Sequence, residues 1–187
     1  RPIRLMIYDI HALQERFYFH NTTLPSLHTA LPLLYAKLRW EGKITHVAFP
    51  DDGAAKRFKN QCLKENYQVI ICGKVRDGDK REITIQEGEV KDNNIIIIDD
   101  LVQTGGTLYE CANLLRERGA ASVSAYVTHG VFPNQSWKRF CRGGDRGIFD
   151  KFYVTNSIPT VSDDLPKDDV FEVLDLTHQI VTDLTPF

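Results

Sequence analysis

A run of four isoleucines at residues 95–98, followed directly by Asp99 and Asp100, constrains the fold more than any other feature of the chain. A stretch that is apolar at every position, rather than at alternate positions, is typical of a parallel strand that is buried on both faces. Parallel neighbours are joined by crossover connections, which are usually helices. The run therefore predicts an α/β fold, a doubly wound parallel sheet with residues 95–98 in a central strand.

Strand-like and helix-like segments alternate along the rest of the chain, as this fold requires. Apolar runs predict strands at residues 5–8, 46–49, 68–72, 122–127, 152–154 and 171–174. Helical spacing predicts helices at residues 24–40, 54–65 and 107–118. Pro32 weakens the first of these helices. Residues 74–91, dense in charge and with two glycines, indicate a hairpin or a mobile loop, and residues 142–150 indicate a loop.

Composition narrows the class of function. The chain has 187 residues, which fits one domain, or one domain and a remnant of another. A formal net charge of -2 argues against nucleic acid as a partner, and no apolar run is long enough for a membrane span. None of the four cysteines forms a CxxC pair, so neither a zinc site nor a redox motif is indicated. We therefore expect reduced thiols in a cytoplasmic protein.

Residues 99–107 carry the strongest chemical signal. Two carboxylates leave the end of the buried strand, and a short loop with Thr104, Gly105 and Gly106 then leads into a helix. The N–H groups and the dipole at a helix N-terminus favour an anion such as phosphate, and glycines let the backbone close around it. Carboxylates can accept hydrogen bonds from vicinal sugar hydroxyls, directly or through a hard cation. The segment therefore predicts a site for a ribose that carries a 5-phosphate. The alternative is that the acids only cap the helix and the glycines only turn the chain.

The string at residues 95–107 resembles the phosphoribosyl pyrophosphate-binding motif of type I phosphoribosyltransferases and of ribose-phosphate diphosphokinases. Residues 9–12, 49–57 and 128–132 resemble further segments of the diphosphokinases, in the order and at a spacing compatible with that family. Residues 101–103 and Asp52 are most similar to the plant-type class II branch, whose members are held not to need free phosphate.

The resemblance implies a type I phosphoribosyltransferase-like fold and the synthesis of phosphoribosyl pyrophosphate, for nucleotide biosynthesis, from ATP and ribose 5-phosphate by Mg²⁺-dependent diphosphoryl transfer. It implies that the catalytic cations, on a loop that closes over the developing charge, are Lys74 and Arg76. It implies that ribose 5-phosphate binds to Asp99, Asp100, Gln103, Thr104, Gly105, Gly106 and Thr107. The implied pyrophosphate loop comprises Asp51, Asp52, Gly53 and Ala54, and the implied Mg²⁺ ligands are Asp9, His11 and Asp51.

The resemblance also bears on domain organisation. Members of the family are built from two similar domains with the active site between them, and they self-associate, so we expect a homo-oligomer. Residues 1–22 are similar to the last strand of the first domain, and residues 23–187 to the second domain. The ATP-base loop of the family lies earlier and nothing here matches it. The chain alone is therefore expected to have little or no synthetase activity.

Two other functions remain open. A type I phosphoribosyltransferase would bind the pyrophosphorylated sugar through the same loop, although no hood segment for the base is identified. A non-catalytic regulatory subunit would keep the fold, although Lys74, Arg76 and the acid pair are all present. The alternative for the two cations is a solvated charged loop. A structural role is the alternative for His11, and for His129 we expect a structural hydrogen bond.

Overall fold

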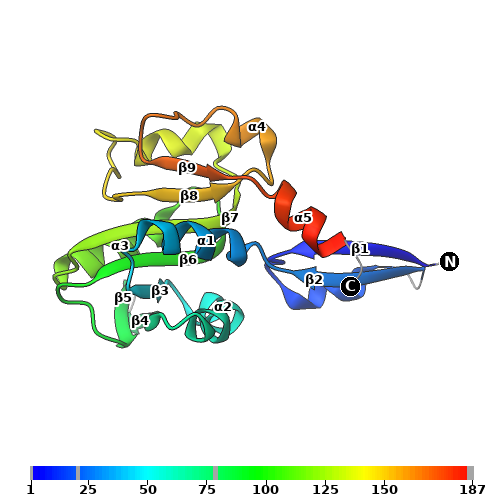
Figure 1. The fold of residues 1–187 in the computed structure, drawn as a ribbon. Coiled ribbons are helices and arrows are strands. Elements are labelled where there is room, and N and C mark those ends of the chain that lie inside the picture. The colour runs from blue at the N-terminus through cyan, green and yellow to red at the C-terminus, as the bar shows by residue number, and fades with distance from the viewer. Residues whose placement is uncertain (1, 20–21, 78–79, 185–187) are drawn as a thin grey trace.

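The main body of the protein is one large, mostly parallel sheet. The structure, a computed structural model, describes residues 2–19, 22–77 and 80–184. Within these residues the sheet has seven strands in the order β5-β4-β3-β6-β7-β8-β9, and only the pair β4 and β5 is antiparallel (Figure 1). The strands are β3 (His46–Phe49), β4 (Gln68–Asp77), β5 (Lys80–Glu87), β6 (Asn94–Val102), β7 (Ser122–Gly130), β8 (Phe152–Thr155) and β9 (Phe171–Leu174). The predicted central parallel strand is confirmed as β6.

Helices cover both faces of this sheet. The helices are α1 (Leu31–Glu41), α2 (Asp52–Lys64), α3 (Gly106–Glu117) and the short α4 (Pro159–Ser162). Ile96 and Ile98 pack in one core cluster with α1 and α2, whereas Ile95 and Ile97 pack in the other with α3. All four isoleucine side chains are fully buried. The run therefore places a rigid strand between two cores, and the carboxyl end of that strand is fixed in position.

A small lobe projects from the edge of the main body (Figure 1). It contains β1 (Ile3–Tyr8) and β2 (Thr23–His28), which pair in parallel, the 3₁₀ helix η1 (Leu13–Tyr18), and α5 (Thr177–Leu184). The hydroxyl of Tyr8 donates to Asp183 at 2.7 Å, which ties α5 to β1. The domain boundary expected at residue 22 stays a prediction, although the strands on its two sides pair with each other.

The helix predicted at residues 24–40 is wrong in its first part. The structure has β2 up to His28 and α1 only from Leu31 onward. The apolar residues of β2 happen to continue the helical spacing of the residues that follow. Pairing with β1 nevertheless determines that β2 is a strand. Pro32 is in the first turn of α1, where proline has no hydrogen bond to break.

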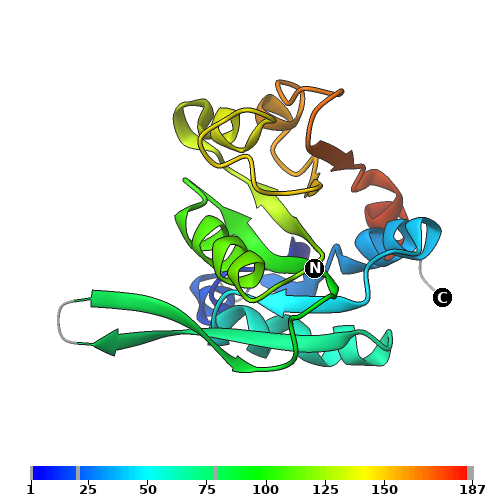
Figure 2. The ribbon, with the colours of Figure 1, turned by 90° about the vertical axis from the view of Figure 1, so that its left-hand side faces the viewer.

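The charged segment at residues 74–91 forms a hairpin, one of the two structures expected for it. Strands β4 and β5 pair from Ile71 with Glu87 to Asp77 with Lys80, and the hairpin extends well beyond the sheet (Figure 2). The segment predicted as a loop at residues 142–150 contains no helix or strand.

One buried carboxylate holds the small lobe to the sheet. Asp9 follows β1, has a positive φ of 45°, and is only 6% exposed. Its Oδ2 accepts from the Ala30 N–H at 2.9 Å and from the Thr128 hydroxyl at 2.6 Å. Because a buried carboxylate without donors is costly, these two bonds fix where the end of β1 meets the start of α1 and the end of β7.

The contact between Asp9 and Thr128 is tested by Thr128→Val, which keeps the side-chain shape and removes the hydroxyl donor. We expect a loss of about 1–3 kcal/mol in the free energy of unfolding, because a buried charged acceptor loses one of its two donors. Urea unfolding measures this. Thr182→Val, on an exposed part of α5, is the matched control and should change stability by less than about 0.5 kcal/mol. Equal effects of the two variants would contradict the anchoring role of Asp9.

Candidate active site

A cleft of about 380 Å³ opens beyond the carboxyl end of β6. In parallel sheets, ligands bind beyond the carboxyl ends of the strands. The residues predicted from the sequence that line the cleft are His11, Asp51, Lys74, Asp99, Asp100, Gln103, Thr104, Gly105, Gly106 and Thr107. The structure therefore brings together predicted residues from four separate segments of the chain. Arg57, for which the sequence analysis gave no role, lines the same cleft.

The loop from Gln103 to Thr107 is shaped as an anion cradle. Gly105 has a left-handed conformation, with φ 71°, and is the N-cap of α3. Among the residues that the structure describes, the N–H groups of Thr104 and Gly105 have no hydrogen-bond acceptor. The ammonium group of Lys74 reaches the loop from β4 and donates to the Thr107 hydroxyl at 3.3 Å. Free N–H groups, a helix N-terminus and a lysine thus face one space, which favours a phosphate group.

The two acids after β6 have different surroundings. Asp100 is 1% exposed, and its Oδ2 lies 2.7 Å from the Arg57 guanidinium and 2.9 Å from Nδ1 of His11. Asp99 is 3.8 Å from the same guanidinium, and within the described part of the chain it accepts only the N–H of Asp100. Burial, together with the charges of Asp100 and Asp51, raises the pKa of Asp99 to about 7. The cleft therefore holds one carboxylate, that of Asp100, which is paired with a guanidinium, and a second, that of Asp99, whose charge is poorly compensated.

Arg57 joins the small lobe to the acid pair. Besides its ion pair with Asp100, it donates to the backbone carbonyl of His11 at 2.6 Å. Its Nε is buried and has no partner among the described residues. The sequence gave a signal for this arginine, because it lies in the segment at residues 49–57 that resembles the diphosphokinases, about one helical turn after Gly53.

The predicted pyrophosphate loop forms the start of α2. Asp51 is the N-cap, and its Oδ1 accepts from the Ala54 N–H at 2.9 Å. Asp51, Asp52 and Gly53 line a second cavity of about 450 Å³, which shares Asp51, His11 and Lys74 with the first. Ala54 is fully buried and lines neither space. The two cavities together give the site an extended shape.

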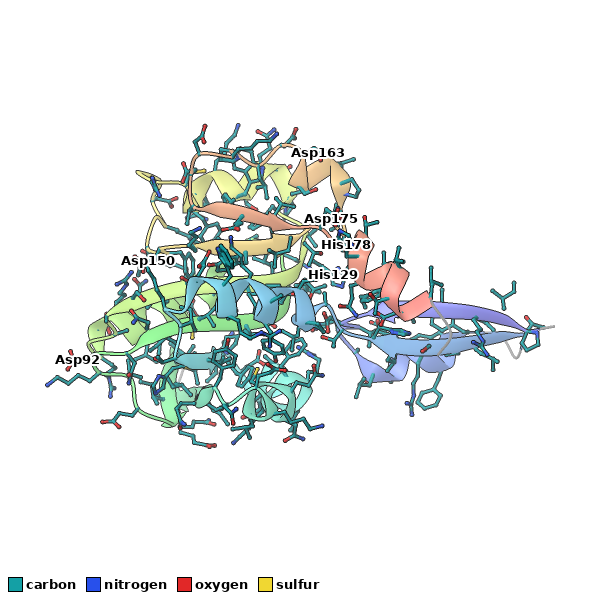
Figure 3. All side chains as sticks on the ribbon, viewed as in Figure 1. Asp92, His129, Asp150, Asp163, Asp175 and His178 are labelled. Carbon is teal, nitrogen blue, oxygen red and sulfur yellow. The ribbon has the colours of Figure 1, made fainter. Side chains whose placement is uncertain are left out.

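Besides Ala54, two residues with a predicted role in the site, Asp9 and Arg76, are not placed in either cavity. The carboxylate of Asp9 is used by the buried hydrogen bonds described above, and Asp9 lines neither cavity of the site. Arg76 lies on β4, but its side chain is outside the part of the chain that the structure describes. At the junction with the small lobe, Nε2 of His129 donates to the Tyr8 carbonyl at 2.8 Å, and Nδ1 is hydrogen-bonded to the Ser157 hydroxyl at 2.9 Å (Figure 3). The expected structural hydrogen bond of His129 is thus present.

The acids of the cleft fit a hard cation that completes its ligands from a substrate. Within the described residues, no group of three or more His, Cys, Asp or Glu side chains is arranged to hold a metal. Mg²⁺, however, is usually held by one or two carboxylates together with waters and substrate phosphates. Asp99 and Asp51 lie near enough for the charge of Asp51 to raise the pKa of Asp99. A cation shared by these two carboxylates would relieve that repulsion.

The fold and this site define a phosphoribosyl transferase domain. Residues 39–151 match the family described as "Phosphoribosyl transferase domain". The chain therefore belongs to that family. A crystal structure of phosphoribosylpyrophosphate synthetase from Mycobacterium smegmatis aligns over 96% of this chain and 57% of its own length, with a TM-score of 0.76 and 23% sequence identity, which shows the shared fold.

Curated relatives make the comparison more specific. Ribose-phosphate pyrophosphokinase 4 from Oryza sativa subsp. japonica is 48% identical over 96% of this chain and 56% of its own length. The chloroplastic ribose-phosphate pyrophosphokinase 3 of the same plant is 44% identical over 98% of this chain and 46% of its own length. The resemblance to plant-type ribose-phosphate diphosphokinases is thus confirmed. The chain spans about half the length of these relatives.

Within the residues that the structure describes, no helix is long and apolar enough to cross a membrane.

The unequal environments of the two acids predict opposite effects of the same substitution. The folded pKa of Asp99, about 7, exceeds the ordinary 3.8, so its ionisation costs stability as pH rises between these values. Asp99→Asn removes that cost and should stabilise the fold by about 1 kcal/mol or more at pH 8, but little at pH 4. Asp100→Asn leaves Arg57 without its ionised partner and should destabilise by about 2 kcal/mol.

Thermal unfolding of both variants between pH 4 and pH 8 tests these signs. The gain from Asp99→Asn must grow with pH. A loss for Asp99→Asn at pH 8, or a gain that does not depend on pH, would show that its charge is already compensated in the folded protein.

The two glycines of the cradle should respond differently to a methyl group. An alanine at Gly105 would need a positive φ, and its Cβ would overlap the ring of Phe140. An alanine at Gly106 would meet no atom within 4 Å. We expect Gly105→Ala to lower the unfolding free energy by about 2 kcal/mol or more, and Gly106→Ala to leave it unchanged or slightly higher. Chemical denaturation checks this, and equal losses would be inconsistent with the geometry described for the loop.

Proposed function

We propose that the chain carries the ribose 5-phosphate site of a ribose-phosphate diphosphokinase. The whole protein would make phosphoribosyl pyrophosphate by moving a diphosphoryl group from ATP to the C1 hydroxyl of ribose 5-phosphate. The observation that carries the proposal is the cleft itself, which places an anion cradle and an ionisable acid pair side by side at the end of β6. The names of the curated relatives support the reaction class.

The geometry supports a role for each end of the cleft. The cradle from Thr104 to Thr107, with Lys74, would hold the 5-phosphate. Asp99 and Asp100 would face the vicinal ribose hydroxyls, which can donate to carboxylates. The second cavity, beside Asp52 and Gly53, would take the diphosphoryl group. Mg²⁺ bound near Asp99 and Asp51 would neutralise and align the polyphosphate.

The proposal extends to the catalytic cations and the metal ligands expected from the sequence. Lys74 would compensate negative charge as it develops, since this residue lines both cavities. Arg76, two residues farther along β4, would also compensate this developing charge. His11 would support the metal site, although its ring is held by Asp100. Asp9 would contribute by fixing the chain before His11 rather than through its own carboxylate.

Other properties of the whole protein stay proposals. Because nothing here resembles the family's ATP-base loop, the chain alone should form little AMP from ATP and ribose 5-phosphate. We also propose a cytoplasmic homo-oligomer. A regulatory subunit would share the cleft but lack turnover in any longer form, and a phosphoribosyltransferase would act on a base instead.

Calorimetric titration of ribose 5-phosphate with Mg²⁺ tests the proposal. We expect saturable binding by the chain, and at least about ten-fold weaker binding by Asp99→Asn, because a neutral amide no longer attracts the cation or accepts from the hydroxyls as strongly. Asp92→Asn is the matched control. Asp92 is exposed and precedes the amino-terminal end of β6, whereas the cleft lies at the carboxyl end of the same strand (Figure 3). It should bind like the parent.

If the folded chain does not bind ribose 5-phosphate, the proposed site fails for this chain. If Asp92→Asn weakens binding as much as Asp99→Asn, the effect is one of net charge and the cleft is not the binding site.

A further inference from the structure

The segment at residues 133–147, here called the clamp segment, lies against the back of the phosphate cradle. It begins with the 3₁₀ helix η2 (Pro133–Phe140) and continues through turns to Gly147. Neither Ser136 nor Arg146 of this segment lines the cleft. The clamp segment therefore contacts the cradle without being part of the surface that a ligand would touch.

Three successive residues of the cradle are each held from this side. The Ser136 hydroxyl donates to the Gln103 carbonyl at 3.2 Å. The Arg146 guanidinium donates to the Thr104 carbonyl at 2.9 Å. The ring of Phe140 lies so close to Gly105 that no side chain fits between them. Because two hydrogen bonds to successive carbonyls and one packing contact come from three different residues, the clamp segment determines the conformation of the loop and not merely its position.

Arg146 is itself held in place at two points. Its backbone N–H donates to the carbonyl of Arg139 at 2.8 Å, and its guanidinium lies 5.2 Å from the ring centroid of Tyr109. Tyr109 is in the first turn of α3, and its N–H donates to the Gly105 carbonyl at 3.0 Å. The guanidinium thus bridges the loop and the helix that follows it. An arginine fixed at both ends loses little freedom when it donates to Thr104.

The fixed carbonyls decide where the N–H groups point. In a trans peptide, C=O and N–H lie on opposite sides of the same plane. A donor that holds the Thr104 carbonyl outward therefore turns the Gly105 N–H inward. In the same way, Ser136 turns the Thr104 N–H, and the first bond of α3 turns the Gly106 N–H. Among the N–H groups without an acceptor in the described residues, those of Thr104 and Gly105 are set by the clamp segment, and that of Gly106 is set by the first bond of α3.

We propose that Arg146 is a positioning residue for phosphate binding, which holds the Thr104–Gly105 peptide so that its N–H faces the anion before the ligand arrives. This rests on the proposed function, because it assumes that the cradle binds the 5-phosphate. Preorganisation of this kind strengthens binding, since the loop does not have to be reoriented when the phosphate is bound. Arg146 acts through the backbone and not by touching the ligand.

The test uses inorganic phosphate and ribose 5-phosphate as separate probes, titrated into the chain by calorimetry. Arg146→Met keeps much of the stem and removes the donor. It should weaken binding of both probes by a similar factor, about ten-fold, because the N–H groups contact only the phosphate group. Arg146→Lys retains one donor and should recover part of the affinity. Asp99→Asn, in contrast, should weaken ribose 5-phosphate much more than inorganic phosphate.

Arg139→Met is the matched control. Arg139 is in the same segment and carries the same charge, but its side chain pairs with Asp145 and makes no contact with the cradle. It should bind both probes like the parent. Ser136→Ala is a second variant that removes one hydroxyl, and it should show a smaller loss with the same equality between the two probes, even if Arg146→Met does not fold.

Equal affinity of the parent, Arg146→Met and Ser136→Ala would overturn the positioning role and leave the proposed function standing. So would a loss for ribose 5-phosphate with none for inorganic phosphate, or a loss for Arg139→Met as large as that for Arg146→Met. If the folded parent binds neither probe, the proposed function and this inference both fail.

Discussion

The site depends most on one buried carboxylate, that of Asp100, and on its pairing with Arg57 and His11. A carboxylate that is 1% exposed is tolerated only where cationic or donor groups surround it. Here the partners come from α2 and from the segment after β1, and Arg57 also binds the His11 carbonyl. One charge at the end of a rigid strand thus determines where three segments meet, and the cleft lies at that meeting point.

The same pairing makes the two adjacent acids unlike each other. Arg57 is committed to Asp100, so its charge compensates Asp99 only from 3.8 Å, and burial raises the pKa of Asp99. Asp99, whose charge is poorly compensated, forms one part of the lining of the cleft, and the N–H groups of the cradle form another. A cation and sugar hydroxyls suit the first part, and a phosphate suits the second. The polarity of the cleft therefore matches the order of groups along a sugar phosphate.

How far the sequence predicts the structure depends on whether a segment is determined locally. The isoleucine run and the glycine loop after it specify β6 and the start of α3, because burial and turn chemistry act within a few residues. Residues 24–28 are determined by pairing with β1, which no local pattern shows, and so β2 was mistaken for helix. Arg57 was left without a role because its partners lie about 40 residues or more away in the chain. The contacts of Arg146 with the cradle were missed for the same reason.

The base of the hairpin formed by β4 and β5 is joined to the phosphate cradle. Lys74 is in strand β4, not in a free loop, and its ammonium group contacts Thr107 of α3. Two residues earlier, the buried thiol of Cys72 lies 3.6 Å from that of Cys111, also in α3. These two contacts join the base of the hairpin to the helix of the phosphate cradle. We infer that Lys74 is a preset part of the cradle, because the strand that carries it is joined to α3 at two points.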